Sequence, residues 1–209
     1  MKRGLVSLGE KLGAMLRSDG LFRPSTLGHH HRDYVIATAV ASAIYGMLMG
    51  SFSLRWQQCL YSAVKLPLFV AVATLVCLPQ FFMMHTILGL RADFKDALGG
   101  VLAAQATLAL VLAALAPMTL VVYASTSSYP LALYYQGIPF LFATLCGQVT
   151  LARHYRPLIA RNPRHRSCRN LWLFLFVFVA TQAAWVLRPF VGTTALPTTF
   201  FRQEAWSNA

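Results

Sequence analysis

The sequence predicts an all-α, polytopic membrane protein with five transmembrane helices, and three observations lead to this fold class. The chain of 209 residues is 57% hydrophobic and only 11% charged, whereas a soluble domain usually carries about a quarter charged residues. Apolar runs recur along it, each near the roughly 20 residues that a transmembrane helix needs. Between the last two runs lies a basic segment, residues 153–169, with six arginines and no acidic residue.

The five predicted spans are residues 34–54, 66–90, 97–124, 131–151 and 171–187. The first carries Ala43, Gly46, Gly50 and Ser53 at helical spacing, which is typical of close packing between helices of one chain and less often of dimerisation. The second contains Pro79, which removes a helix hydrogen bond and predicts a kink or a break. The predicted connections are residues 55–65, 91–96, 125–130 and the basic segment.

The distribution of basic residues predicts the orientation in the membrane. With five spans, fourteen of the eighteen lysines and arginines fall on one side, in residues 1–33, 91–96 and 153–169. Short basic loops are retained on the cytoplasmic side. We therefore expect a membrane protein with its N-terminus inside and its C-terminus outside. Anionic lipids of the inner leaflet are expected to contact the arginines of the basic segment, Arg153, Arg156, Arg161, Arg164, Arg166 and Arg169.

Two segments flank the predicted five-helix membrane domain, residues 34–191. In the basic cytoplasmic segment, residues 1–33, leucines recur at helical spacing among basic residues. This pattern fits an interfacial amphipathic helix or a frayed basic tail. The C-terminal segment, residues 192–209, contains Phe200, Phe201 and Trp206. Such aromatic surface predicts an ordered cap at the outer face and a contact surface for another subunit, or self-packing without a partner.

The sequence offers no specific case for an enzyme. It holds six acidic residues, all outside the middle of the predicted spans, and no recognisable catalytic or phosphate-binding motif. The four cysteines are isolated, without zinc-ligand spacing. The basic residues flank apolar runs, as topology signals do, so nucleic-acid binding is not expected.

Four polar residues within the spans are candidate functional residues: Gln80, His85, Gln105 and Gln148. In hydrocarbon such groups hydrogen-bond other helices or converge on a wet cavity. His85 lies close to Arg91 in the sequence. Both a structural or interfacial histidine and a proton- or ligand-binding histidine fit this position.

Several stretches together carry a family resemblance: YGMLMGSF (45–52), LYSAVKLPL (60–68), LPQFFMMHTILGLRADF (78–94), YRPLIARNPRHR (155–166) and WVLRPFVGTTALPTTFFRQEAWSNA (185–209). They resemble a family of uncharacterised bacterial multi-pass inner-membrane proteins, distantly similar to the Yip1 class of five-span proteins. Yip1-like proteins act as membrane scaffolds and partners of other membrane proteins. The resemblance therefore implies a non-enzymatic role, without assigning any site residue.

The sequence thus favours a non-enzymatic integral membrane protein, a structural or accessory subunit or scaffold of a larger membrane protein assembly. The alternative is a small transporter or channel component that uses the broken second span. A transporter would require the four polar candidates to converge on a cavity, whereas an accessory subunit requires apolar surface that faces a partner.

Overall fold

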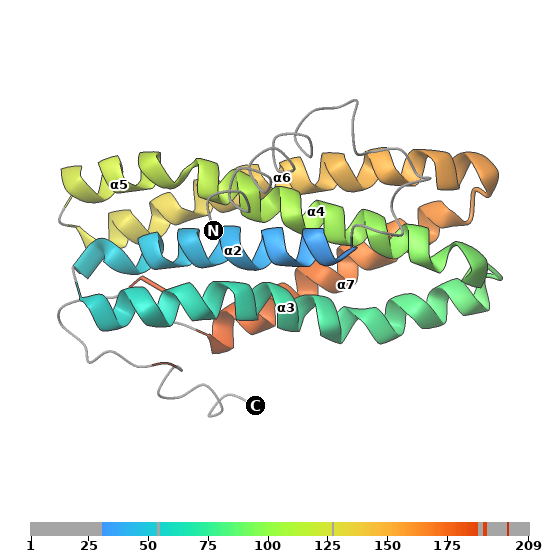
Figure 1. Cartoon of the computed structure of the whole chain (residues 1–209), viewed down its shortest axis with the longest axis horizontal. Coiled ribbons are helices and arrows are strands. Elements are labelled where there is room, and N and C mark those ends of the chain that lie inside the picture. Colours follow the sequence, from blue (N-terminus) through green and yellow to red (C-terminus); the bar gives the residue numbers. More distant parts are fainter. Residues whose placement is uncertain (1–30, 54, 127, 188–189, 192–199, 201–209) are drawn as a thin grey trace.

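The helices of the computed structural model run side by side in one elongated bundle (Figure 1). The structure describes residues 31–53, 55–126, 128–187, 190–191 and 200, and these contain no β-strand. The all-α prediction is confirmed for this part of the chain. The predictions for residues 1–30, and for Phe201 and Trp206, lie outside it. The elements are α2 (His31–Met49), the 3-10 helix η2 (Gly50–Ser53), α3 (Trp56–Ile87), the 3-10 helix η3 (Arg91–Asp93), α4 (Phe94–Ala114), α5 (Ala116–Ser125), α6 (Tyr129–Arg161) and α7 (His165–Val186).

Four of these segments are long and apolar enough to cross a membrane: His31–Phe52, Trp56–Ile87, Arg91–Ala114 and His165–Val186. They correspond to the first, second, third and fifth predicted spans. The fourth predicted span lies within α6, which is not among the four. The structure therefore supports a membrane protein with four helices of spanning length.

The connection predicted at residues 55–65 is wrong, because α3 already begins at Trp56 and continues for 32 residues. Three polar residues of its first turns are buried on one helical face, Gln58, Ser62 and Lys65. Their spacing of four and three residues is that of neighbouring positions on a helix. The polar composition of this segment predicts a loop, whereas three of its polar side chains form the inward face of a helix.

The prolines act differently at two positions. At Pro79, α3 continues without a break, so the predicted alternative of a broken second span is wrong, and the predicted bend stays a prediction. The predicted 97–124 span instead divides at Leu115 into α4 and α5. Pro117 lies in the first turn of α5, where its missing N–H costs no helical hydrogen bond.

The basic segment is two helix ends rather than a loop. Helix α6 continues through Arg153 and Arg156 to Arg161, and α7 begins at His165 after a three-residue connection. Arginine is a good helix former, and a proline shortly after a helix end is common. Pro163 occupies such a position. At this end of the bundle, the basic end (right in Figure 1), α3 and α6 end and α4 and α7 begin.

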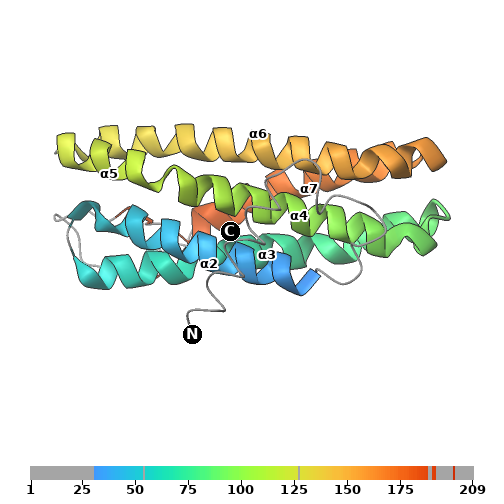
Figure 2. The ribbon, with the colours of Figure 1, turned by 45° about the horizontal axis from the view of Figure 1, so that its top comes forward.

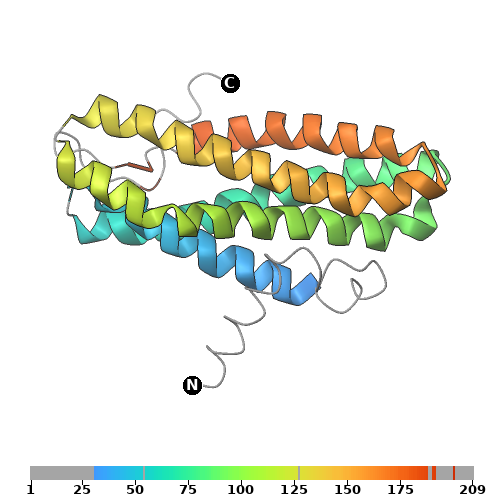
Figure 3. The same cartoon turned by 90° about the horizontal axis from the view of Figure 1, so that it is seen from above.

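The contacts between neighbouring helices form a ring. Helix α2 packs on both α3 and α4, α4 packs on α6, and α3 packs on α7. A smaller contact between α6 and α7 completes the ring. Figure 2 shows α6 extending along α4, and Figure 3 shows α6 between α4 and α7. One apolar core lies at the basic end around Phe81 and Trp172, and a second lies at the opposite end around Tyr45 and Leu112.

Two residues of the small-residue stripe, Gly46 on α2 and Gly50 on η2, pack against α3, as the prediction of helix packing within one chain requires. A Cβ atom at Gly46 would overlap the backbone oxygen of Ser62, and one at Gly50 would lie 2.6 Å from the backbone oxygen of Gln58. Only glycine permits such a close approach of two helix backbones. These two glycines therefore set the distance between α2 and the first half of α3.

Candidate functional site

His85 is buried at the basic end, in the last turn of α3. Its side chain has no exposed surface, and its Nδ1 atom lies 2.9 Å from the backbone oxygen of Phe81. The ring packs edge-on against Phe81 and Phe94, with centroid separations of 4.4 Å and 5.6 Å. The structure thus places His85 in an aromatic core, not among the exposed groups at that end.

A second buried histidine, His165, is the first residue of α7. Its Nε2 atom lies 3.1 Å from the Oδ2 atom of Asp93, and its ring centroid lies 6.0 Å from that of His85. The other carboxylate oxygen of Asp93 lies 3.9 Å from the Nη1 atom of Arg161. Asp93 and Arg161 are partly exposed, whereas His165 is fully buried. One carboxylate therefore joins the surface to a pair of buried imidazoles.

Three buried polar atoms in this group have no hydrogen-bond partner: Nε2 of His85, Nδ1 of His165 and the hydroxyl of Tyr155. The Tyr155 and His165 ring centroids are 6.4 Å apart. Buried polar groups are normally paired with protein or ordered water. These three atoms are therefore the unsatisfied polar groups of the cluster. No group of three or more metal-ligating side chains occurs among the described residues.

Tyr155 and its neighbour in the sequence, His154, are both buried on α6 near this end. Burial lowers the pKa of His154, although the backbone oxygen of Thr150 acts in the opposite direction. Burial also raises the pKa of Tyr155. Both side chains are therefore neutral near neutral pH, and the arginines supply the positive charge of α6 at the basic end.

Gln105 faces a cavity of about 340 Å³ between α2, α3 and α4. The side chain is 6% exposed. The other candidate residues do not line this cavity: His85 lies at the basic end, Gln80 is exposed on α3, and Gln148 is half-buried on α6. The structure therefore does not bring the four predicted residues together.

The opposite end of the bundle contains a hydrogen-bonded network that sequence reasoning missed. The hydroxyl of Tyr45 donates to Gln136 Oε1 at 2.7 Å, and Gln136 Nε2 donates to the hydroxyl of Tyr123. Thr119 lies 3.5 Å from the Tyr45 hydroxyl. These residues come from α2, α5 and α6, so their convergence leaves no local spacing in the sequence. The network joins three helices at this end.

The chain after α7 returns to the first turns of α3. Ser62 donates a hydrogen bond of 2.6 Å to the backbone oxygen of Phe190, and Gln58 donates one of 3.2 Å to the same atom. Farther along, the Phe200 ring packs edge-on against Tyr61 at 5.6 Å and lies 5.2 Å from Lys65 Nζ. Of the three predicted contact residues, Phe200 thus packs within the chain. The buried polar face of α3 is the sequence signal that could have indicated this docking.

The arginines of the basic segment are mostly exposed around the basic end. Arg153, Arg156, Arg161, Arg164 and Arg166 are exposed, and Arg169 is half-buried. Arg164 donates a hydrogen bond of 3.4 Å to the backbone oxygen of Leu88, and Arg169 donates one of 3.1 Å to Asn170. The exposed guanidinium groups are accessible to anions at this surface.

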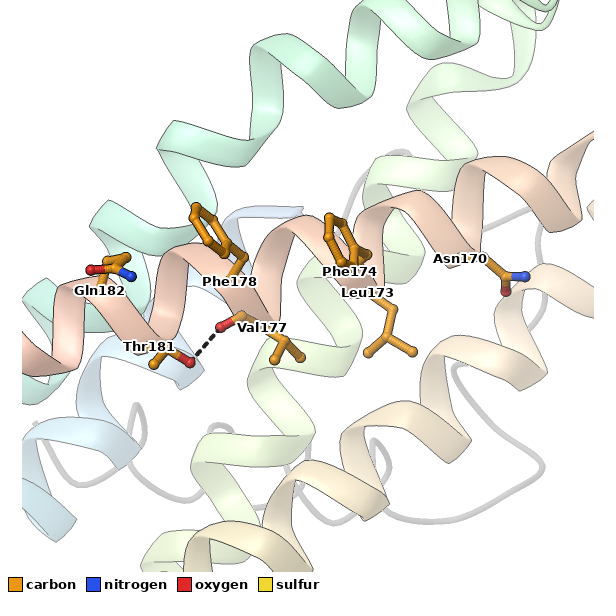
Figure 4. Close-up of a pocket in the computed structure, with 7 residues that line it drawn as sticks. All are labelled: Asn170, Leu173, Phe174, Val177, Phe178, Thr181 and Gln182. Atoms are coloured by element: carbon orange, nitrogen blue, oxygen red, sulfur yellow. Dashed lines mark hydrogen bonds between the residues drawn. The ribbon is translucent and has the colours of Figure 1, made fainter.

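Helix α7 presents one open face. Figure 4 shows its outward side chains, with Phe174 and Phe178 between Asn170 and Gln182 near the two ends. Only 6% of the apolar segment of α7 is buried, against 33% to 56% for the other three segments of spanning length. An amide at each end and aromatic rings between them form a continuous surface along the helix.

The comparisons with known proteins find no match: no family model, no curated protein and no solved structure matches this chain.

Proposed function

We propose that the protein is a five-span integral membrane protein in which α6 supplies the fourth span in chain order. Its residues 131–151 turn apolar side chains outward and bury Gln136 and Thr150, as a helix surrounded by lipid does. The buried polar residues lower the mean hydropathy of α6 without making its outer surface polar. The exposed apolar side chains of α6 are Leu131, Leu133, Tyr134, Ile138, Leu141, Phe142, Leu145 and Val149.

The basic end is proposed to face the cytoplasm, in the bacterial inner membrane. Its exposed arginines satisfy the rule that short basic segments stay inside, and each arginine near an anionic surface contributes about 1 kcal/mol of attraction. With this orientation, residue 31 lies toward the cytoplasm and residue 186 toward the outer face. The bend predicted at Pro79 belongs to the same proposal.

Within this membrane placement, the protein is proposed to be a non-enzymatic accessory subunit or scaffold of a larger membrane protein assembly. The observation that carries the proposal is the open face of α7. Helix association in lipid relies on packing and on interhelical hydrogen bonds. The face offers Phe174 and Phe178 for packing and Asn170 and Gln182 for hydrogen bonds, which suits a second transmembrane helix. The distant similarity to the Yip1 class belongs to this proposal.

No described arrangement favours the alternative of a small transporter or channel component. That alternative relied on a broken second span, whereas α3 continues through Pro79. It also required convergent polar residues, whereas Gln80, Gln105 and Gln148 lie apart.

The proposal is tested by comparing two faces of the protein in its native membrane. A photoreactive amino acid is introduced at Val177 on α7 or at Ile138 on α6, both exposed. We expect a protein crosslink from position 177 and only lipid adducts from position 138. The double variant Phe174→Ala/Phe178→Ala, combined with the Val177 probe, should abolish the protein crosslink.

The matched control is Leu141→Ala/Leu145→Ala, which removes similar apolar area from the exposed side of α6. This variant should retain the crosslink from position 177, and both double variants should migrate as folded protein in mild detergent. If position 177 yields only lipid adducts, and native gels give the mass of a single chain, the accessory-subunit proposal is wrong.

A further inference from the structure

The cavity between α2, α3 and α4 is lined in part by small side chains. Ala39 comes from α2, and Pro67 and Ala71 come from α3. Together with the larger apolar residues around them they leave about 340 Å³ unfilled. This volume lies within the range of roughly 300–1,000 Å³ of pockets that bind small molecules.

Two polar atoms of the cavity lining are buried without a hydrogen-bond partner, Oε1 of Gln105 and Oγ1 of Thr74. The two side chains are 6% and 8% exposed. The hydroxyl of Thr107 donates to the backbone oxygen four residues earlier, at 2.9 Å. Thr74 makes no such bond, although it also lies within a helix. Its hydroxyl therefore has no hydrogen-bond partner among the described residues.

The surroundings of these two atoms are apolar and uncharged. Most of the lining is aliphatic, and Val35 and Leu75 at its edge are more than half exposed on the outside of the bundle. The cavity thus opens sideways, toward lipid chains when the helices span a membrane. Gln105 and Thr74 lie well inside α4 and α3, far from the helix ends where phospholipid headgroups reside.

We propose that this cavity binds a small apolar molecule that carries a hydroxyl group, of the phenol, quinol or isoprenoid-alcohol class, taken up from the lipid phase. Both oxygens are covered in this structure, so binding turns the Gln105 and Thr74 side chains toward the cavity. A hydroxyl can then donate to Gln105 Oε1 and accept from the hydroxyl of Thr74. The aliphatic walls bury the rest of the molecule. The inference depends on the membrane placement and is independent of the accessory role assigned to α7.

The experiment uses the full-length protein in vesicles of phosphatidylcholine and phosphatidylglycerol. Two photoreactive probes are compared, an alkylphenol and the corresponding alkylbenzene without the hydroxyl, and adducts are mapped by mass spectrometry. We expect both to reach the cavity lining, with the phenol labelling Leu75 and Leu102 about five- to tenfold more strongly, as one or two net hydrogen bonds give. The methyl ether of the phenol, which cannot donate, should label at an intermediate level.

The variant Thr74→Val/Gln105→Leu keeps the cavity volume and removes both polar atoms. It should label equally with the two probes, whereas the control Thr107→Val/Gln148→Leu should keep the preference for the phenol. The single variant Thr74→Val, with a smaller expected loss of the preference for the phenol, serves if the double variant does not fold.

Equal labelling of the native protein by phenol and alkylbenzene, or a preference that survives Thr74→Val/Gln105→Leu, would overturn the proposal. Loss of the α7 crosslink leaves this result unchanged, so the two proposals fail separately.

Discussion

The Nε2 atom of His165 lies 3.1 Å from the Oδ2 atom of Asp93, and this contact ties the first residue of α7 to the turn that precedes α4. Because His165 is fully buried, loss of this partner leaves its Nε2 atom without the contact that the fold provides. The pair thus anchors the least buried helix of the bundle at the basic end.

Replacing Asp93 with alanine should lower the free energy of unfolding by about 1–3 kcal/mol, since it leaves a buried polar group unpaired. Unfolding in mixed detergent micelles, followed by circular dichroism, measures the change. Arg161→Ala is the control, because its 3.9 Å contact to Asp93 is largely exposed and should contribute at most about 1 kcal/mol. Equal effects of the two substitutions would contradict an anchoring role of the His165 contact.

At the opposite end, Tyr45→Phe should destabilise the protein by about 1–2 kcal/mol, because it deprives buried Gln136 of a hydrogen-bond donor without changing the packing of the ring. The same unfolding measurement applies. Tyr134→Phe is the matched control, since Tyr134 is 79% exposed, and should change stability by less than about 0.5 kcal/mol. A neutral Tyr45→Phe would mean that the network does not stabilise the junction of α2, α5 and α6.

Two glycines, one at the contact between α2 and α3 and one in open space on α6, give predictions of opposite sign. Gly46→Ala should destabilise by about 1–3 kcal/mol, because the added Cβ meets the backbone oxygen of Ser62 and the helices must separate. Gly137→Ala, in the interior of α6, meets no atom within 4 Å and should stabilise by about 0.5–1 kcal/mol through helix propensity. Thermal unfolding of the two variants in parallel checks both signs, and destabilisation of equal size would contradict the close-contact explanation.

The sequence predicted the helices better than their ends. Apolar runs identify a membrane helix, because lipid imposes length and apolarity on any segment that crosses it. The ends at Trp56 and Arg161 were missed, since polar residues continue these helices by facing inward, as Ser62 does, or by projecting beyond the apolar region, as Arg156 does. Composition alone does not distinguish such a segment from a loop.

The candidate residues were predicted one at a time, and their surroundings were not. His85 was recognisable as an unusual residue in an apolar run, but its neighbour His165 is 80 positions away in the sequence. The proximity of the two rings depends on the packing of α3 against α7. In the same way, the cavity at Gln105 is lined by residues of α2 and α3 as well as of α4, which no spacing within α4 indicates.

The orientation can be tested with single exposed cysteines at the two ends. Cys168, the natural candidate, is fully buried in the core of the basic end, so an impermeant thiol reagent does not reach it in the folded protein. We therefore choose Ser167→Cys, next to the arginines, and Ser128→Cys, before α6, both at exposed positions. The half-buried natural cysteines, Cys59 and Cys146, are replaced by alanine to remove background labelling.

In intact spheroplasts of a bacterial host, an impermeant maleimide should label Ser128→Cys and leave Ser167→Cys unlabelled, because the arginines hold the basic end on the cytoplasmic side. In inverted membrane vesicles the pattern should reverse, and detergent should make both positions reactive, which shows that each cysteine is accessible in principle. The positions differ in their side of the membrane and not in their exposure, so the contrast reports orientation alone.

Labelling of Ser167→Cys in intact spheroplasts would place the basic end outside. Labelling of both positions from the same side would instead remove α6 from the spans, since α6 is the helix that separates residue 128 from residue 167.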